Sequence, residues 1–237
     1  MKRVFFTVAL IVFIALTTLV AGSAVAQEVV PAVEVFGGYS LLKLGASIDD
    51  IKGLQSDIPT VGGDGVGWNI NDSSFFLSRG ASGSVAFNIN EYFGIETAAH
   101  YHQGNVLEGS FGLPSPELPG TIVQTPFVFS MKNVSALAGP RLTFRREKAT
   151  VFAHALAGLD YWRLTGDFIV AGEHDSFSDN SSGFGVAIGG GFDVNVNERI
   201  AVRVIQADYY LTRHVQRQLN NMNLSFGIVF KIGEASW

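Results

Sequence analysis

The segment His174-Asp175-Ser176 brings a candidate nucleophile, a candidate base and a carboxylate together, and Glu173 precedes it. Acyl-transfer enzymes need such groups in contact: a hydroxyl that attacks, a base that takes its proton and a carboxylate that orients the base. The segment lies in a stretch rich in Ser, Asp and Asn, which is typical of a solvated loop, and the chain has no Gly-x-Ser-x-Gly turn. We therefore expect an ordinary loop, assign no catalytic residue, and expect a protein that is not an enzyme.

A second candidate is the pair His100 and His102, which would share one face of a strand with Glu96. Two histidines at this spacing could ligate a metal, but no third close ligand can be named. The chain has no Cys, which excludes a thiolate site. We expect these side chains to line a polar interior, and we assign no metal and no cofactor.

Charged residues also occur at alternate positions inside otherwise apolar stretches. A period of two indicates a strand with one greasy face and one polar face. In the last such stretch, residues 223–232, the even positions from Leu224 to Ile232 are apolar and Lys231 falls on the other face. Buried charges must be paired, so we expect a structural salt-bridge network inside a closed sheet rather than a conduction path. The charged residues assigned to this network are Glu34, Glu96, Arg141, Arg145, Asp160, Asp193, Arg203, Asp208 and Lys231.

Arg203 is at an odd position and Asp208 at an even position of one expected strand, residues 200–214, so regular alternation would put them on opposite faces. Both can face inward only if an extra residue interrupts the alternation. Without it, one of them would face lipid, at a cost of about 2–4 kcal/mol for a base at the bilayer midplane. The sequence therefore predicts a β-bulge near Ile205 and Gln206.

The same alternation predicts eight strands, at 33–44, 81–90, 93–102, 129–146, 150–164, 183–196, 200–214 and 223–232. The connections at 45–80, 103–127 and 166–182 are long. They alternate with tight turns at 90–92, 147–149 and 197–199, and a link of medium length at 216–221 precedes the last strand. Residues 47–58 could form helical turns, and the prolines of 103–127 argue against a central strand there. Outward aromatic residues near strand ends are expected to form interfacial girdles. They are Tyr39, Tyr92, Phe93, Tyr101, Phe144, Tyr161 and Trp162.

Strands of this length with long connections on one side only are typical of outer-membrane barrels, which have short periplasmic turns and longer extracellular loops. A soluble sandwich is the competing architecture, but its strands are usually five or six residues long. We expect an all-β fold: an eight-stranded antiparallel up-and-down transmembrane β-barrel.

The N-terminus predicts export. Lys2 and Arg3 precede an apolar run at 4–20, and Ala24-Val25-Ala26 is a small-x-small cleavage site. We expect residues 1–26 to be a signal peptide and residues 27–237 to be the barrel domain. The alternative is an uncleaved anchor. Cleavage near Ala26-Gln27 leaves 14 Lys and Arg against 21 Asp and Glu, which opposes nucleic-acid binding because that requires a basic surface.

The chain resembles the outer-membrane β-barrel domain family, the small OmpA/OmpX-like eight-stranded barrels. The resembling blocks cover the strands but not the loops. They are FGGYS at 36–40, NIN at 88–90, FGIE at 93–96, AGPRLTF at 138–144, FAHALAG at 152–158, GGGFD at 189–193 and RVIQADY at 203–209. The resemblance implies a monomer in the cell outer membrane, in contact with outer-membrane lipids and lipopolysaccharide. It also implies that the peptidoglycan-binding domain of longer OmpA-type proteins is absent.

The last strand also resembles the assembly signal of such proteins, which the barrel-assembly machinery reads. Ser225, Gly227, Phe230 and Ile232 fit its pattern. The pattern normally ends on a terminal aromatic residue, whereas here four residues separate Ile232 from Trp237. Trp237 is expected either at the membrane interface or in an untethered tail.

The expected function is structural or surface-interactive: envelope integrity or adhesion, with a lumen plugged by paired charges. Two alternatives stay open. One is a narrow porin-like channel, and the other is a lipid A-modifying enzyme of the kind found among small outer-membrane barrels.

Overall fold

The computed structural model describes residues 30–45, 68–70, 77–114, 120–170, 173–214 and 217–235. The expected signal peptide and the expected helical turns at 47–58 lie outside these residues, as does Trp237. Every regular element in the described part is a strand, and no helix there is long and apolar enough to cross a membrane. The strands are β1 (Val33–Lys43), β2 (Trp68–Ile70), β3 (Leu77–Asn88), β4 (Phe93–Pro114), β5 (Ile122–Arg146), β6 (Ala149–Val170), β7 (Glu173–Asn195), β8 (Ile200–His214) and β9 (Arg217–Ile232).

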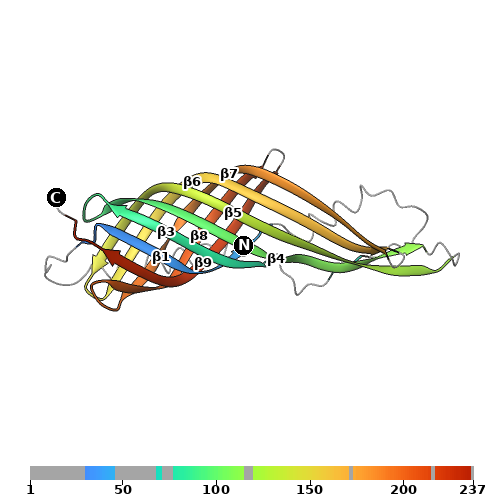
Figure 1. Ribbon diagram of the computed structural model, residues 1–237, viewed down its shortest axis with the longest axis horizontal. Helices are drawn as coiled ribbons and strands as arrows, with labels where there is room; N and C mark the ends of the chain where they lie inside the picture. Colours follow the sequence, from blue (N-terminus) through green and yellow to red (C-terminus); the bar gives the residue numbers. More distant parts are fainter. Residues whose placement is uncertain are drawn as a thin grey trace, which may run out of the picture.

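Eight of these strands close into a ring, as predicted. The sheet runs β4-β3-β1-β9-β8-β7-β6-β5, and the pairing of β4 with β5 closes it. Each neighbouring pair is antiparallel, and β1 meets β9 from Val33↔Ile232 to Lys43↔Met222. The barrel is visible on the left of Figure 1. Because the sheet is closed, its backbone groups are paired between strands and no edge remains within the ring.

The three predicted tight turns lie at one end of the barrel, together with the start of β1 and the end of β9. We call this the turn end. Two of the turns have the same hydrogen bonds. Asn90 Oδ1 accepts from the amides of Tyr92 and Phe93, and Asn197 Oδ1 accepts from the amides of Arg199 and Ile200. A short amide side chain that bonds its own backbone favours a tight turn. The sequence motif Asn-Glu therefore fixes where these strands reverse.

The opposite end, which we call the hairpin end, differs from the prediction. The long connections 103–127 and 166–182 are mostly strand. β4 and β5 pair as far as Pro114↔Ile122, and β6 and β7 pair as far as Val170↔Glu173. These four strands continue well beyond the ring, as the long arm on the right of Figure 1 shows. The first long connection also contains a strand, since β2 pairs with β4 at Gly109–Phe111.

The prolines did not prevent strand formation, because they occupy positions where an amide is not needed. Pro126 pairs with Ser110 of β4, and β5 begins to pair with β6 only at Phe127. Pro140 lies inside the barrel wall, where the β5–β6 ladder is interrupted between Ala138 and Arg141 without a change of register. Proline lacks an N–H, so it is tolerated at such edges and gaps.

Side chains alternate between the lumen and the outer surface along every barrel strand. The predicted bulge is present in β8, one residue earlier than expected. Val204 and Ile205 both face outward between the buried Arg203 and Gln206, and the register shifts there against β7 and β9. Trp162 was placed outward by the sequence interpretation, which is wrong. It follows the outward Tyr161 in a regular strand, so it must point inward, and it is 8% exposed.

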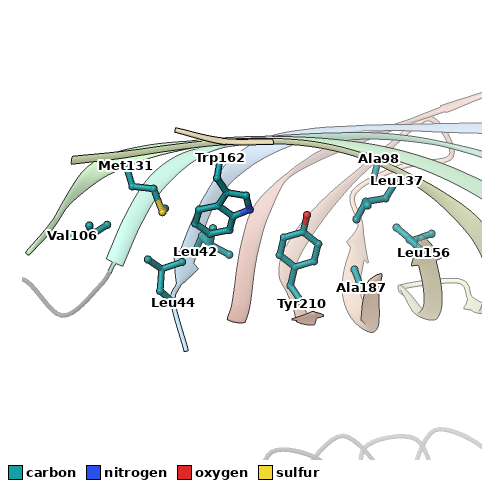
Figure 2. Packing of buried hydrophobic residues seen from close by; sticks show 10 residues of the cluster. All are labelled: Leu42, Leu44, Ala98, Val106, Met131, Leu137, Leu156, Trp162, Ala187 and Tyr210. Carbon is teal, nitrogen blue, oxygen red and sulfur yellow. The ribbon is translucent and has the colours of Figure 1, made fainter. Parts of the chain in front are cut away.

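Apolar side chains fill part of the interior. Leu42, Leu44, Met131 and Trp162 belong to one buried cluster, which extends to Tyr210 (Figure 2). A smaller cluster of Phe36, Ala201 and Val229 lies nearer the turn end. On β8, the charged Arg203 and Asp208 lie between Ala201 of the smaller cluster and Tyr210 of the larger one.

Candidate functional site

The first interior group centres on Glu34 of β1. Its two carboxylate oxygens accept from Arg141 Nη2 at 2.8 Å and from Arg145 Nη2 at 2.6 Å, both on β5. Arg145 also donates to Asn88 Oδ1 at 2.9 Å and to the carbonyl of Glu91 in the adjacent turn. Arg141 is 1% exposed and reaches Glu96 of β4 at 3.9 Å. One buried guanidinium therefore connects the carboxylates of two strands.

His154 of β6 continues this chain across the lumen. Its Nδ1 lies 2.9 Å from Glu96 Oε2, and its Nε2 lies 2.9 Å from Asp208 Oδ1 of β8. A ring with a carboxylate at each nitrogen must donate from both, which only the positively charged imidazolium does. The sequence prediction omits His154 from the network, although the alternation along residues 150–164 places its side chain on the inner face.

Arg203 of β8 completes the chain. It forms a bidentate pair with Asp193 of β7, with donor–acceptor distances of 2.8 and 3.1 Å. Its third donor reaches Gln206 Oε1 at 2.7 Å, and Gln206 Nε2 donates to Asp208 Oδ2 at 2.8 Å. The β8 bulge makes this possible, because it turns Arg203 and Gln206 to the same side although they are three residues apart. Gln206 was also missed by the sequence prediction, which considered charged residues alone.

Aromatic rings pack against the two buried arginines. The Arg141 and Arg203 guanidiniums each lie 4.2 Å from the centre of the Phe152 ring, and Arg203 lies 4.3 Å from that of Phe36. Such contacts are favourable because the ring face carries partial negative charge. They also fill the space around the ion pairs with side-chain atoms.

The other two predicted members have hydrogen-bond partners of their own. Lys231 Nζ donates to Asn195 Oδ1 at 2.7 Å near the turn end. Asp160 lies in a separate interior cluster, where it accepts from Asn133 at 2.7 Å, from the Tyr210 hydroxyl at 2.6 Å, and from the Trp162 indole. The structure thus brings seven of the nine assigned charges into one connected group, which His154 and Gln206 link.

The histidine pair has polar partners of its own. The two rings stack with centroids 6.2 Å apart. His100 Nδ1 lies 2.8 Å from Ser82 Oγ, and His102 Nε2 lies 2.5 Å from Ser40 Oγ. Glu96 turns away from them toward His154. Within the described residues, no three His, Asp or Glu side chains are grouped as metal ligands.

A small cavity of about 10 Å³ adjoins both histidines and Asp208, with Leu42 and Tyr210 also in its wall. This is about the volume that one water molecule needs. His102 Nδ1 is buried and has no hydrogen-bond partner among the described residues. The cavity is therefore suited to a single water rather than to an organic ligand.

The residues of the expected assembly signal divide between the two faces of β9. Ser225 points inward, 3.2 Å from Ser82 Oγ, while Phe230 and Ile232 face outward and are 48% and 54% exposed. Gly227 lies opposite Gly38 of β1, and a Cβ at Gly227 would come 2.3 Å from the carbonyl oxygen of Gly37. Only glycine fits this approach of the first and last strands.

The segment that could have formed a nucleophilic site is strand, not loop. His174 and Ser176 lie on β7 beyond the ring, opposite Ile169 and Asp167 of β6. Both side chains are exposed, and within the described chain neither forms a side-chain hydrogen bond. Their geometry shows no coupling between a nucleophile and a base.

Comparison with known proteins places these features in a family. Residues 12–231 match the outer membrane protein beta-barrel domain. The solved structure of Ail, the attachment invasion locus protein of Yersinia pestis, is 14% identical, with 85% of this chain and 99% of that chain covered and a TM-score of 0.43. Neisserial surface protein A is 13% identical over 85% and 97% of the two chains, with a TM-score of 0.42. OprG from Pseudomonas aeruginosa is 9% identical over 89% and 100%, with a TM-score of 0.41.

No curated protein is similar enough to the chain to count as a match. The family match nevertheless spans most of the sequence and includes all the strands of the closed ring. The chain therefore belongs to the outer membrane protein beta-barrel domain family, and it is an eight-stranded barrel of the outer membrane.

Proposed function

We propose that this protein is a barrel with a closed lumen that acts at the cell surface through the part of β4–β7 that extends beyond the ring. The observation that carries the proposal is the regular strand pairing of this extension. β5 pairs with β6 from Phe127↔Phe168 toward the turn end. Beyond that pair, the β4–β5 hairpin continues to Pro114↔Ile122 and the β6–β7 hairpin to Val170↔Glu173. In outer-membrane barrels the short turns face the periplasm, which puts the extension outside the cell.

The extension offers an open strand edge. β8 begins to pair with β7 only at Phe184↔Arg213, so residues 173–183 have β6 as their sole strand neighbour in the described chain. An exposed edge can accept an extended segment of another protein as an added strand. Contact through this edge would serve adhesion, and contact with other envelope components would serve envelope integrity.

Proline substitutions can test the edge without disturbing the hairpin. The Asn195 amide donates to the Lys148 carbonyl, so along the uninterrupted β6–β7 ladder the amides of odd-numbered β7 residues point to β6. Even-numbered amides then point to the open edge. The double variant Ser176→Pro with Asn180→Pro removes two of the amide N–H groups at the open edge, whereas Ser176→Thr with Asn180→Thr keeps both.

The assay measures attachment of cells that produce each form to protein-coated and uncoated surfaces. We expect the wild-type protein and the threonine form to raise attachment, and the proline form to lose most of that gain. Equal attachment by both forms would show that the edge is not used. If no form changes attachment, survival in detergent of a strain lacking the gene tests the envelope-integrity role.

The closed lumen rests on the connected charges. Glu34, Arg141, Glu96, His154 and Asp208 follow one another by direct contacts across the interior. An eight-stranded barrel has an interior that side chains can fill. We therefore expect purified protein in planar bilayers to give no single-channel steps. Discrete, reproducible steps would favour the narrow-channel alternative.

A non-enzymatic role is part of the proposal, and the lipid A-modifying alternative can be tested directly. Ser176→Ala and His174→Ala variants are compared with wild-type protein on lipopolysaccharide, and the lipid products are analysed by mass spectrometry. We expect unchanged lipid with all three forms. Modification by the wild-type protein that either variant abolishes would assign an enzyme.

The remaining parts of the proposal concern how the protein is inserted into the membrane and its oligomeric state. We propose a monomer in contact with outer-membrane lipids and lipopolysaccharide, inserted by the barrel-assembly machinery after cleavage near Ala26-Gln27. The mass of the purified protein tests the cleavage, since a chain that retains residues 1–26 would show an uncleaved anchor. Crosslinking in intact cells tests the monomer.

A further inference from the structure

Four polar side chains form a row on the outer surface of adjacent strands. Arg79 of β3 lies opposite Gln103 of β4, Gln103 lies opposite Lys132 of β5, and Lys132 lies opposite Arg163 of β6. All four are exposed. With about 4.8 Å between strands, the row spans roughly 15 Å and contains three cations. Such a row is unusual on the outward face of a membrane barrel, where charge is costly near the midplane.

The next outward residues toward the membrane show the level at which the row lies. They include Tyr101 and Tyr161, which flank Val134 in register, and Tyr39 lies on the same level of the wall. Each of these tyrosines is 42% exposed, and the Tyr101 hydroxyl donates to Gln103 Oε1 at 2.8 Å. Tyrosine favours the boundary between hydrocarbon and headgroups. The cations therefore lie at the headgroup level of the outer leaflet.

The row borders a groove with a volume of about 600 Å³. Arg79, Lys132 and Arg163 all line it, together with the hydrogen-bonding side chains of Asn105 and Ser130, and no acidic residue is in its wall. Within the described residues none of the three cations forms a salt bridge. Arg163 donates its Nε to Ser178 Oγ at 3.0 Å, which leaves its terminal nitrogens available. The chain as a whole is acidic, with a net charge of −5, so the cluster departs from the overall charge balance.

We propose that this groove binds the headgroup of a lipid that carries two phosphates. Lys132 and Arg163 are neighbours across one strand spacing and would hold one phosphate. Arg79 lies two spacings from Lys132, about 10 Å away, and would hold the second. Charge-assisted hydrogen bonds from arginine to phosphate are strong and often bidentate. The proposal needs the membrane insertion of the barrel, and it does not depend on the surface role of the extension.

The test compares three forms of one glucosamine-based lipid: bisphosphorylated, monophosphorylated and dephosphorylated lipid A. Each is titrated into full-length wild-type protein in a neutral detergent, and bound lipid is counted by native mass spectrometry. Each basic residue near an anionic surface contributes about fivefold to binding, so three predict roughly a hundredfold preference for the bisphosphorylated over the dephosphorylated form. The monophosphorylated form should fall between them. Equal binding of all three would overturn the proposal.

The variant Arg79→Gln with Lys132→Gln and Arg163→Gln should lose this preference. If the triple variant does not give a folded, heat-modifiable band, Lys132→Gln alone should reduce binding about fivefold. Retained preference in a folded variant would contradict the assignment. Inorganic phosphate is added in a separate arm. Displacement of the lipid by equimolar phosphate would show a site for free anions and would also overturn the lipid proposal.

A matched control removes the same charge from the turn end. Arg146, Lys148 and Arg199 are exposed cations at that end, and replacing all three by Gln should change lipid binding by less than about twofold, because surface charges more than a Debye length away are screened. An equal loss in both triple variants would show that net charge alone governs binding, which the proposal does not allow.

Discussion

Replacing Arg203 by Met tests whether the lumen charges stabilise the barrel as a connected unit. The variant keeps an unbranched apolar stem beside Phe36 and Phe152, but it removes both bonds to Asp193 and the bond to Gln206. Asp193 is 1% exposed, so its carboxylate would remain buried without the salt bridge. Breaking one side of a buried ion pair costs about 3–5 kcal/mol, largely because the remaining charge is uncompensated.

This origin of the cost predicts the result of a double-mutant cycle. Asp193→Asn alone should also be strongly destabilising, since it leaves the Arg203 guanidinium without its partner. Asp193→Asn combined with Arg203→Met removes both charges, and replacing a buried pair by uncharged groups is often close to neutral. The free energy of unfolding of the double variant should therefore be equal to, or higher than, that of the less destabilised single variant.

The free energy of unfolding is measured by urea titration of the protein in lipid vesicles, with tryptophan fluorescence as the signal. Arg199→Met, an exposed residue of the adjacent turn, is the control and should change stability by less than about 0.5 kcal/mol. The reasoning is refuted if Arg203→Met costs less than about 1 kcal/mol, or if the two single costs add in the double variant, because independent sites add.

Three further outcomes follow from the strands. Deleting Val204 removes the bulge but keeps Arg203 and Asp208 inward, so the heat-modifiable band on electrophoresis should persist, whereas deleting Ala207 turns a lumen residue toward lipid and should abolish it. Pro140→Ala supplies an amide at the gap in the β5–β6 ladder and should leave urea stability unchanged or raise it by about 1 kcal/mol; a loss would show that the gap is needed. Removing residues 234–237 should leave insertion into outer-membrane fractions intact, and failed insertion would assign the assembly signal to the tail.

Much of the barrel follows from local signals in the sequence. The alternation of side chains locates each wall strand and its inward face, and the Asn-Glu turns mark where strands reverse. The opposite parity of Arg203 and Asp208 was enough to require a bulge, and the structure has one. Trp162 shows that residue type alone can mislead. Tryptophan is typical of a membrane girdle, but Trp162 directly follows the outward Tyr161 in a regular strand, and this position puts its side chain inside the barrel.

The extension could not be predicted in this way. Residues 173–183 of β7 are rich in Ser, Asp and Asn and give no apolar period of two, and the prolines of 103–127 argued against strands on the other side of the extension. The strands of the extension pair because the wall strands below them already hold them in register. The contact of His154 with Glu96 and Asp208 was equally inaccessible, since the three residues come from alternate strands and meet only across the closed lumen. That distance depends on the barrel's diameter and stagger, which no single strand encodes.

The length of the extension determines how far its tip lies from the membrane. β5 has 25 residues, about 80 Å of strand at 3.3 Å per residue, and a tilted crossing of the bilayer uses about ten of them. Roughly 50 Å of strand therefore remains outside the hydrocarbon. Loops of the same length would sample many distances from the membrane, whereas paired strands continue the direction of the wall (Figure 1). The tip is thus held at a nearly fixed distance from the lipid. The number of residue pairs in the two hairpins determines that distance.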